Sequence, residues 1–457
     1  MDRILALSAV AQARLIRERK ISSLELVQTH LSRIEAIQPI LNATTELPAE
    51  SAEAEARRAD RSPARGPLHG VPFSIKDSIE VSGTVSTAGT AGRRRAEPSR
   101  CDATVVARLK NAGAIPIAKT NLPDLLFAFE SDNLLFGRTN NPYDVTRTSG
   151  GSSGGEAALI AACGSAMGLG SDCAGSVRLP AAFCGIAGIK PTSGRIPRTG
   201  HFPPSGGWIE ALWQIGPMAR HVEDLQVMMS LLAGPDGADH SVAALPFTSM
   251  DENDIGTLRI AWYADNGFAE PDGEVAAVVG DAARALGAHE CRLPCLADAY
   301  GIEMKLLGAD GSDSVRAYAA GLGSHELHPL LTGWLDKLAA YRTDLAGFQS
   351  YWAEWDGFRA AITAFLREYD AIVCPVYTHA ALPHGASIEE LNFRGFSYTM
   401  AYNLAGLPAA VVRCGTSSSG LPIAVQVVGR AWREDIALAI AARLEREFGG
   451  WKQPPER

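Results

Sequence analysis

The chain has 457 residues, of which 46% are hydrophobic and 20% are charged, as is ordinary for a globular protein. Its net charge of −9 repels a phosphate backbone, so no nucleic acid partner is expected. The basic run Arg93-Arg94-Arg95 is too short to reverse this, and we interpret it as a solvated loop rather than an anion site. The least polar stretch, 157–170, is too short and too rich in glycine to span a bilayer, so no membrane association is expected.

The cysteines argue against a structural metal. Cys291 and Cys295 are close in sequence, but no second pair has zinc-finger spacing, so no metal and no cofactor is expected. Cys163, Cys173 and Cys184 stand among small residues, as buried free thiols do, which favours a reducing compartment. The N-terminal sequence lacks the apolar core and cleavage site of a signal peptide, so a cytoplasmic location is predicted.

Helices are predicted at the start of the chain, over 2–38. Ser22 and Glu25 fit a capping box, in which each residue's side chain bonds the other's backbone N–H. Leu24, Val27 and Leu31 then recur at helical spacing. The next expected elements are a surface helix and turn over 46–66, a helix over 104–112 capped by Gly113, and a strand over 114–118.

Strands and helices alternate in the second half of the chain. A strand–helix–strand unit is predicted over 257–297, followed by mostly helical sequence over 300–368. The last expected elements are strands over 372–374, 409–413 and 423–428, a hairpin-like turn over 415–420, and a helix over 432–448. Interspersed strands and helices with one hairpin predict an α/β protein with a mixed sheet.

Small residues are dense over 137–200. They allow close backbone approach and positive φ, as expected where backbone amides must point at a reacting atom. A flexible linker is the alternative, but interleaved apolar runs such as 157–162 argue against it.

Three clusters in this region carry chemistry, although each alone has an ordinary explanation. Lys76 follows an apolar run, so it either snorkels to solvent or is buried with a lowered pKa and acts as a base. Ser152 lies in Gly-Gly-Ser-Ser-Gly-Gly, which matches the G-x-S-x-G nucleophile elbow but also resembles a common turn. Ser176 follows two small residues whose N–H groups could form an oxyanion hole.

Together the clusters resemble the amidase signature family. The matching segments are Gly-Val-Pro-Phe-Ser-Ile-Lys-Asp at 70–77, the Gly/Ser run at 150–155, and Ser-Asp-Cys-Ala-Gly-Ser-Val-Arg-Leu-Pro at 171–180. Flanking segments at 131–142, 216–225, 403–408 and 420–426 are also similar, so the resemblance covers roughly 20–235 and 370–447.

The resemblance implies one α/β domain over 1–457, with a large mixed β-sheet covered by helices on both faces. Its expected parts are an N-terminal helical segment (1–65), a catalytic core (67–235), a variable substrate-side region (240–365), and C-terminal strands with a helix (370–447).

The resemblance also implies a role for each matching residue. Ser176 matches the nucleophile, Ser152 the relay serine that follows a cis peptide bond, and Lys76 the general base and acid. A neutral lysine can activate a serine through such a relay. The backbone N–H groups of the oxyanion hole match Cys173, Ala174, Gly175 and Ser176, and the supporting residues match Ser153, Asp172 and Arg178.

Two residues depart from the family pattern. Cys173 and Ala174 stand where Thr, Ile or Leu and then Gly are usual, and alanine takes positive φ less readily than glycine. Cys173 raises the alternative of a cysteine nucleophile, but no histidine lies in its motif.

The implied activity is hydrolysis of small neutral amides, anilides or carbamates, with possible urethanase or esterase side activity. The family also contains the glutaminase subunit of the tRNA-dependent amidotransferase, which is the main alternative. A Ser-His-Asp hydrolase and a catalytically dead binding module are further alternatives. The expected partner is a small amide or carbamate, and the oligomeric state, a homodimer included, stays open. Aromatic residues expected near the acyl pocket, unless they only pack in the core, are Phe129, Phe202, Trp208 and Trp213.

Overall fold

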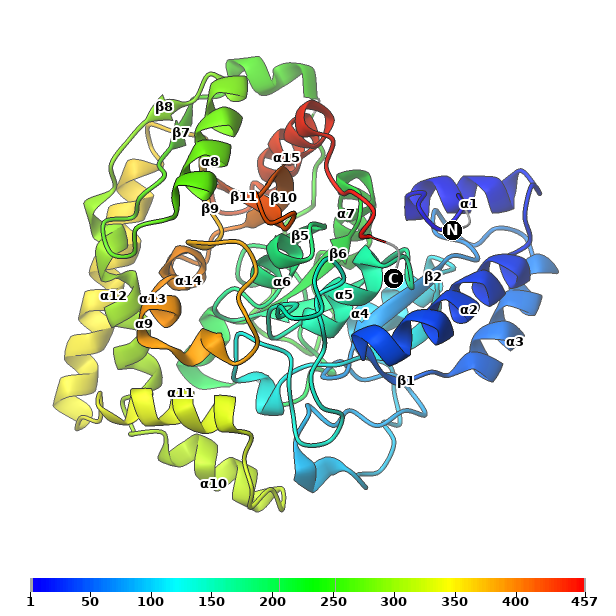
Figure 1. Cartoon of the computed structure of the whole chain (residues 1–457), viewed down its shortest axis with the longest axis horizontal. Coiled ribbons are helices and arrows are strands. Elements are labelled where there is room, and N and C mark those ends of the chain that lie inside the picture. Colours follow the sequence, from blue (N-terminus) through cyan, green and yellow to red (C-terminus); the bar gives the residue numbers. More distant parts are fainter. Residues whose placement is uncertain (1–2, 205, 251, 456–457) are drawn as a thin grey trace.

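The computed structural model describes residues 3–204, 206–250 and 252–455 (Figure 1). One 11-stranded sheet runs through the molecule in the order β1-β3-β2-β4-β6-β5-β10-β11-β9-β7-β8. Its strands are β1 Thr44–Glu46, β2 Pro72–Lys76, β3 Ile115–Thr120, β4 Met167–Asp172, β5 Ala187–Lys190, β6 Gln214–Ala219, β7 Ile260–Trp262, β8 His289–Glu290, β9 Ala371–Pro375, β10 Ala409–Thr416 and β11 Pro422–Gly429.

The sheet is mixed, as predicted. β2 pairs in parallel with β3 and β4, and β7 pairs in parallel with β8 and β9. The other neighbouring strands are antiparallel, including β10 and β11, the hairpin expected from the sequence. Because β2 and β4 are parallel neighbours, their carboxyl ends lie at the same edge of the sheet. This brings Lys76 close to the residues that follow β4.

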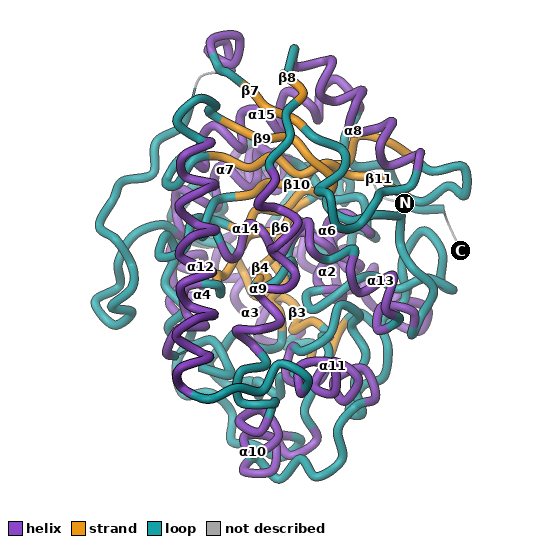
Figure 2. The backbone as a smooth tube through the Cα atoms, turned by 90° about the vertical axis from the view of Figure 1, so that its left-hand side faces the viewer, coloured by secondary structure: helices purple, strands orange, loops and turns teal. Residues whose placement is uncertain are grey.

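Helices cover both faces of the sheet (Figure 2). Successive side chains along a strand therefore pack alternately into two hydrophobic cores. In β9, Ala371 and Val373 pack on one side and Ile372 and Cys374 on the other. The α-helices are α1 Ala9–Arg17, α2 Ser23–Leu41, α3 Ala49–Asp60, α4 Thr104–Asn111, α5 Gly154–Ala161, α6 Arg178–Phe183, α7 Val222–Leu232, α8 Gly273–Leu286, α9 Ala299–Leu307, α10 Asp313–Gly321, α11 Pro329–Ala339, α12 Leu345–Phe365, α13 Glu390–Arg394, α14 Ser397–Leu404 and α15 Glu434–Phe448.

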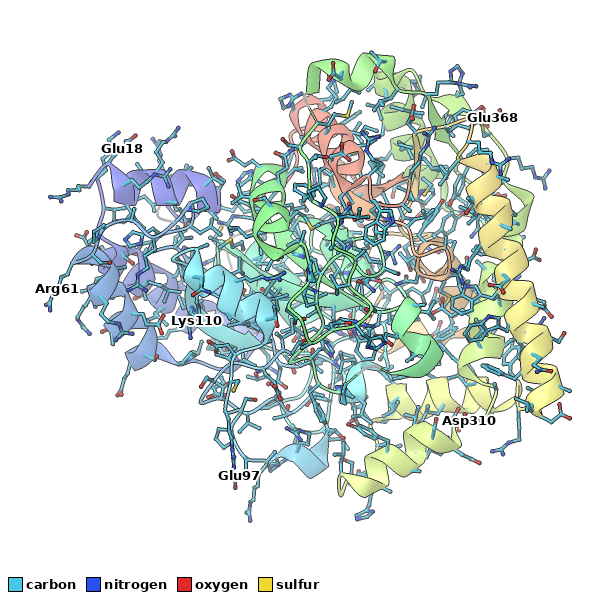
Figure 3. The ribbon with its side chains drawn as sticks, turned by 180° about the vertical axis from the view of Figure 1, so that it is seen from behind. Glu18, Arg61, Glu97, Lys110, Asp310 and Glu368 are labelled. Carbon is cyan, nitrogen blue, oxygen red and sulfur yellow. The ribbon has the colours of Figure 1, made fainter. Side chains whose placement is uncertain are left out.

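The helices divide between the two faces according to their buried side chains. α1, α4, α7, α8 and α15 share a core with one face of the sheet. On the other face, α2, α3, α5 and α6 cover one part, and α9, α12 and α14 cover the rest. Charged side chains labelled in Figure 3, among them Glu18, Lys110 and Glu368, lie on the outside of the molecule. No helix in the described ranges is long and apolar enough to cross a bilayer.

The local signals in the sequence correspond to local structure. The Ser22 hydroxyl accepts the Glu25 N–H at 3.1 Å, and the Glu25 carboxylate accepts the Ser22 N–H at 2.9 Å, which completes the predicted capping box of α2. Gly113 follows α4 with φ +91°. The last helix begins at Glu434 rather than at 432, because Trp432 has φ +68° and is not helical.

The segment rich in small residues is structural core rather than a linker. Nearly all of 148–192 is buried, and it forms α5, β4, α6 and β5. At Gly151, an added Cβ would lie 2.6 Å from the backbone nitrogen of Glu130, so only glycine fits there. The loops that bear Ser152 and Ser176 are therefore held tightly in the centre of the molecule.

Candidate active site

Lys76 ends β2 and is completely buried. Its Nζ lies 2.7 Å from the Ser152 Oγ, 3.1 Å from the Ser171 Oγ and 3.3 Å from the Ser171 carbonyl oxygen. Burial lowers the pKa of Lys76 to about 7, because desolvation outweighs the attraction of Asp172 and Glu156 for the charged form. A large fraction of this amine is therefore neutral near pH 7 and able to accept a proton.

Glu156 on α5 is, after Asp172, the second nearby acid that favours the charged form of Lys76. Its carboxyl group accepts hydrogen bonds from the hydroxyls of Ser74 and Thr120. Burial nevertheless raises the pKa of Glu156 to about 8, so it is mostly protonated at pH 7. The neighbourhood thus lets Lys76 lose its proton without leaving a carboxylate unpaired beside it.

Ser152 and Ser176 come from two loops that meet over the end of β4. The peptide bond between Gly151 and Ser152 is cis, as the sequence resemblance implied. The Ser153 N–H donates to the Ser176 carbonyl at 3.1 Å, which ties the loops together. Ser176 is 7% exposed, and both its side chain and that of Ser152 line one pocket. The Ser153 hydroxyl bonds both the carbonyl oxygen and the N–H of Ser171, each at 3.3 Å.

Asp172 and Arg178 hold the loop that carries Ser176. The Asp172 carboxylate accepts the N–H groups of Gly175 and Val177, the Arg178 guanidinium at 3.0 Å, and the Asn403 amide at 2.9 Å. Burial alone would raise the pKa of Asp172, but Arg178 holds it well below its usual value. Asp172 is therefore a permanent buried anion around which this loop is wrapped.

Backbone donors remain free near Ser176. Among the described residues, the N–H groups of Cys173, Ala174 and Ser176 have no acceptor, as an oxyanion hole requires. The Gly175 N–H is already engaged by the Asp172 carboxylate at 2.8 Å, which corrects the expectation that it belongs to the same set. Gly175 has φ +126°, and a Cβ there would overlap Thr399, whereas Ala174 has no positive φ. The alanine therefore costs no backbone strain.

The pocket at Ser176 is lined mainly by apolar side chains and has a volume of about 40 Å³. No charged residue lies among its described lining residues, which are Leu125, Leu126, Phe127, Ser152, Ser171, Cys173, Ala174, Ser176, Ile209, Trp213, Leu307 and Trp334.

The expected pocket aromatics have different positions. Trp213 lines the pocket. Phe129 lies one layer behind, with its ring centroid 4.7 Å from that of Trp334. Phe202 lies elsewhere, beneath the guanidinium of Arg93 at 3.9 Å. The side chain of Trp208 lies outside the described residues.

Comparison with known proteins identifies the family. The family model for Amidase matches residues 25–438. The chain belongs to the amidase signature family. Fatty-acid amide hydrolase 2 of Homo sapiens is 32% identical to it, over 99% of this chain and 91% of that protein. One subunit of the glutamyl-tRNA(Gln) amidotransferase of Synechococcus sp. (strain CC9605) is also 32% identical, over 96% of each chain.

A solved structure supports the same assignment. 6-Aminohexanoate cyclic dimer hydrolase, complexed with its substrate, is 26% identical and has a TM-score of 0.86, covering 100% of this chain and 99% of that one. The family and fold expected from the sequence are thus confirmed. As a member of the amidase signature family, the chain is a hydrolase of amide C–N bonds.

The alternative nucleophiles are not favoured by the geometry of this amidase. Burial, and then the nearby Glu303, raise the pKa of the Cys173 thiol well above its usual value, so it stays protonated. No histidine is present among the described residues that line the pocket, so a Ser-His-Asp arrangement around Ser176 is absent there.

A metal centre also has little support. In the described part of the chain, the one cluster with metal-ligating potential is Glu210, Asp239 and His240. Arg198 donates to both carboxylates of this cluster, so their charge is already compensated.

Sequence reasoning missed some of the residues that complete the amidase site. Ser171 stands in the matched segment 171–180, but nothing in the sequence indicates that it contacts Lys76 directly, as it does. Leu307 and Trp334 reach the pocket from 240–365, where no motif matches the family. For Trp334 no sequence signal exists beyond its being a large aromatic residue in a helical segment.

Replacing Arg178 by methionine should leave the Asp172 carboxylate buried without its counter-ion. We expect a loss of about 3–5 kcal/mol in the free energy of unfolding, measured by urea denaturation, together with loss of activity. The matched control is the double variant Asp172→Asn, Arg178→Met, which removes both charges and should recover part of this stability. If Arg178→Met is as stable as the unmodified chain, the Asp172–Arg178 ion pair does not stabilise the fold as proposed.

Proposed function

We propose that this chain hydrolyses small neutral amides, anilides or carbamates through an acyl-enzyme on Ser176. Ser152 relays the proton and Lys76 is the general base and acid, with esters as side substrates. The observation that carries the proposal is the 2.7 Å contact between the Lys76 Nζ and the Ser152 Oγ, at a pocket that also holds Ser176. A base, a relay hydroxyl and a candidate nucleophile are thus grouped where a carbonyl group could enter.

Acylation begins with proton transfer from Ser176. Ser152 accepts that proton while giving its own to neutral Lys76, and the Ser176 Oγ attacks the carbonyl carbon. The negative charge that develops on the carbonyl oxygen is met by the free N–H groups of Cys173, Ala174 and Ser176.

The second half of the cycle returns the protons. Charged Lys76 gives its proton through Ser152 to the leaving amine, so the C–N bond breaks and an ester on Ser176 remains. Water then attacks this ester, again with Lys76 as base, and the acid product leaves with Ser176 restored.

An apolar pocket favours a neutral substrate. Trp213, Trp334 and Phe127 supply aromatic surface, and none of the described lining residues is charged. Two arginines of the variable region 240–365, Arg316 and Arg342, would suit an amino-acid carboxylate, but they are paired with Asp336 and Asp313 on the surface. These features support an apolar or aromatic substrate over glutamine, although one relative belongs to an amidotransferase.

Ser176→Ala should lower turnover by about 10⁴-fold or more, because it removes the attacking oxygen. Mass spectrometry after treatment with an alkyl fluorophosphonate should place the label on Ser176 in the unmodified chain and find none in the variant. Cys173→Ala is the control and should still be labelled. Labelling that disappears in Cys173→Ala but persists in Ser176→Ala would show that Cys173, and not Ser176, is the nucleophile.

The rate of amide hydrolysis should rise with pH and level off above a pKa of about 7, because only neutral Lys76 accepts a proton. Below this value, kcat/KM should fall about tenfold per pH unit. Burial lowers the pKa of Lys190 to about 7 as well, but Lys190 does not line the pocket. Lys190→Met is therefore the matched control and should keep this limb of the profile. If the pH dependence shifts in Lys190→Met, the titrating group is Lys190 and not Lys76.

An aryl amide should be hydrolysed with a kcat/KM about a hundredfold above that of glutamine, since burying an aromatic ring contributes about 2–3 kcal/mol. Trp213→Ala should reduce this preference. Phe202→Ala is the control, because Phe202 lies outside the pocket and its loss should leave the ratio unchanged. A preference for glutamine, or activity that requires partner proteins, would favour the amidotransferase alternative.

A further inference from the structure

A buried histidine contacts Ser171, the residue that accepts hydrogen bonds from Lys76. His201 forms an isolated antiparallel β-bridge with Ile79, which lies just after β2, and its side chain is buried, with the residue 6% exposed. Its Nε2 lies 3.0 Å from the Ser171 Oγ and 3.1 Å from the Ser78 Oγ, and its Nδ1 lies 3.2 Å from the Pro203 carbonyl oxygen. The indole of Trp213 packs edge-on against the ring, with centroids 4.8 Å apart.

These contacts determine where the protons of His201 are. A carbonyl oxygen only accepts hydrogen bonds, so Nδ1 carries the proton and donates it to Pro203. Burial lowers the pKa of His201 to about 3, so the ring is neutral at pH 7 and Nε2 has no proton. Nε2 therefore offers one lone pair, which the hydroxyl protons of Ser171 and Ser78 share in a bifurcated hydrogen bond.

The consequence for Lys76 follows from counting its hydrogen bonds. A neutral amine has two N–H groups and one lone pair. If the Ser171 hydroxyl points to His201, the Ser171 Oγ and carbonyl oxygen accept both N–H groups of Lys76. The lone pair is then left for Ser152, at 2.7 Å.

We propose that His201 is a positioning residue for the base. By holding the proton of the Ser171 hydroxyl, it directs the lone pair of Lys76 to Ser152. This inference rests on the proposed function, since it presumes that Lys76 accepts a proton through Ser152. His201 is not one of the described residues that line the pocket, but it contacts two that do, Ser171 and Trp213.

Without an acceptor at this position, the Ser171 hydroxyl is free to turn and donate to the Lys76 lone pair. That bond competes with Ser152 and lowers the rate. Charged Lys76 has no lone pair to accept this hydroxyl proton, so the neutral amine is favoured and the pKa of Lys76 falls. Simple loosening of the core would act in the opposite direction, because admitting water raises the pKa of a buried lysine.

The titratable and charged groups around the pair are the same in each variant. Asp172, Glu156 and Cys173 act on Lys76, and Lys76, Arg198 and Lys119 act on His201. Removing a neutral imidazole leaves all of them in place. A shift in the pKa of Lys76 therefore reports the Ser171 hydroxyl rather than a lost charge.

The test measures how fast an alkyl fluorophosphonate labels Ser176 across a range of pH. In this reaction the Ser176 oxygen bonds to phosphorus, fluoride leaves, and the serine proton passes through Ser152 to Lys76. Because fluoride leaves without a proton, the labelling rate depends on Lys76 as a base and not as an acid. We expect His201→Phe to label at least about tenfold more slowly, with its pH limb moved to lower pH. His201→Gln places an acceptor oxygen near the Nε2 position and should restore most of the rate.

Two further variants make the result decisive. In a Ser171→Ala background, His201→Phe should cause no additional loss, because the competing hydroxyl is gone. If His201→Phe does not fold, as judged by circular dichroism, His201→Asn replaces it, since asparagine reaches Pro203 but offers nothing at Nε2.

The outcomes separate this inference from the proposed function. Labelling of His201→Phe at the normal rate, a limb moved to higher pH, or an undiminished effect in Ser171→Ala would overturn the role of His201 alone. Failure of the unmodified chain to be labelled at Ser176 would overturn both proposals.

Discussion

The buried pair of Asp172 and Arg178 is the interaction on which the site depends. Both side chains are fully excluded from water, and such a pair is stable only when its remaining hydrogen bonds are also made. Here they are made by the loop itself and by distant parts of the chain. Arg178 reaches the Thr399 carbonyl on α14 and the Gln426 amide on β11, both at 3.0 Å. One ion pair thus joins the loop of Ser176 to the C-terminal strands and helices.

This anchoring explains why so little of the loop needs glycine. The Asp172 carboxylate accepts the Gly175 N–H, whereas the neighbouring N–H groups of Cys173, Ala174 and Ser176 have no acceptor among the described residues. In this loop only Gly175 has a positive φ, and Thr399 also fills the space where a side chain would be, so glycine is needed there for both reasons. Cys173 and Ala174 depart from the family pattern, yet the role proposed for them uses the backbone N–H, which every non-proline residue has.

Much of the site could be predicted because its parts are local in sequence. Lys76, Ser152 and Ser176 each stand in a short motif, and the capping box at Ser22 is complete within four residues. The order of the strands could not be predicted in this way. β5 lies between β6 and β10, a neighbour far along the chain, and such pairings depend on tertiary packing rather than on local propensity.

The pocket walls show the same limit. Phe202 is adjacent in sequence to the buried His201, but its ring turns outward to Arg93. Proximity along the chain gives the region of a side chain but not its direction. Trp334 lines the pocket from α11, and no sequence motif indicates this position, because apolar packing tolerates many different sequences.

Burying Lys76 has a thermodynamic consequence for the whole fold. An unfolded lysine keeps its ordinary pKa of 10.5, whereas the folded one has a pKa of about 7. Between these values the unfolded chain binds a proton that the folded chain does not, so folding stability rises with pH across this window. Below it, the full penalty of about 5 kcal/mol applies, which is comparable to the net stability of many domains. The desolvation that makes this amine a base at neutral pH therefore lowers the stability of the fold by an amount that depends on pH. The rest of the core offsets this loss.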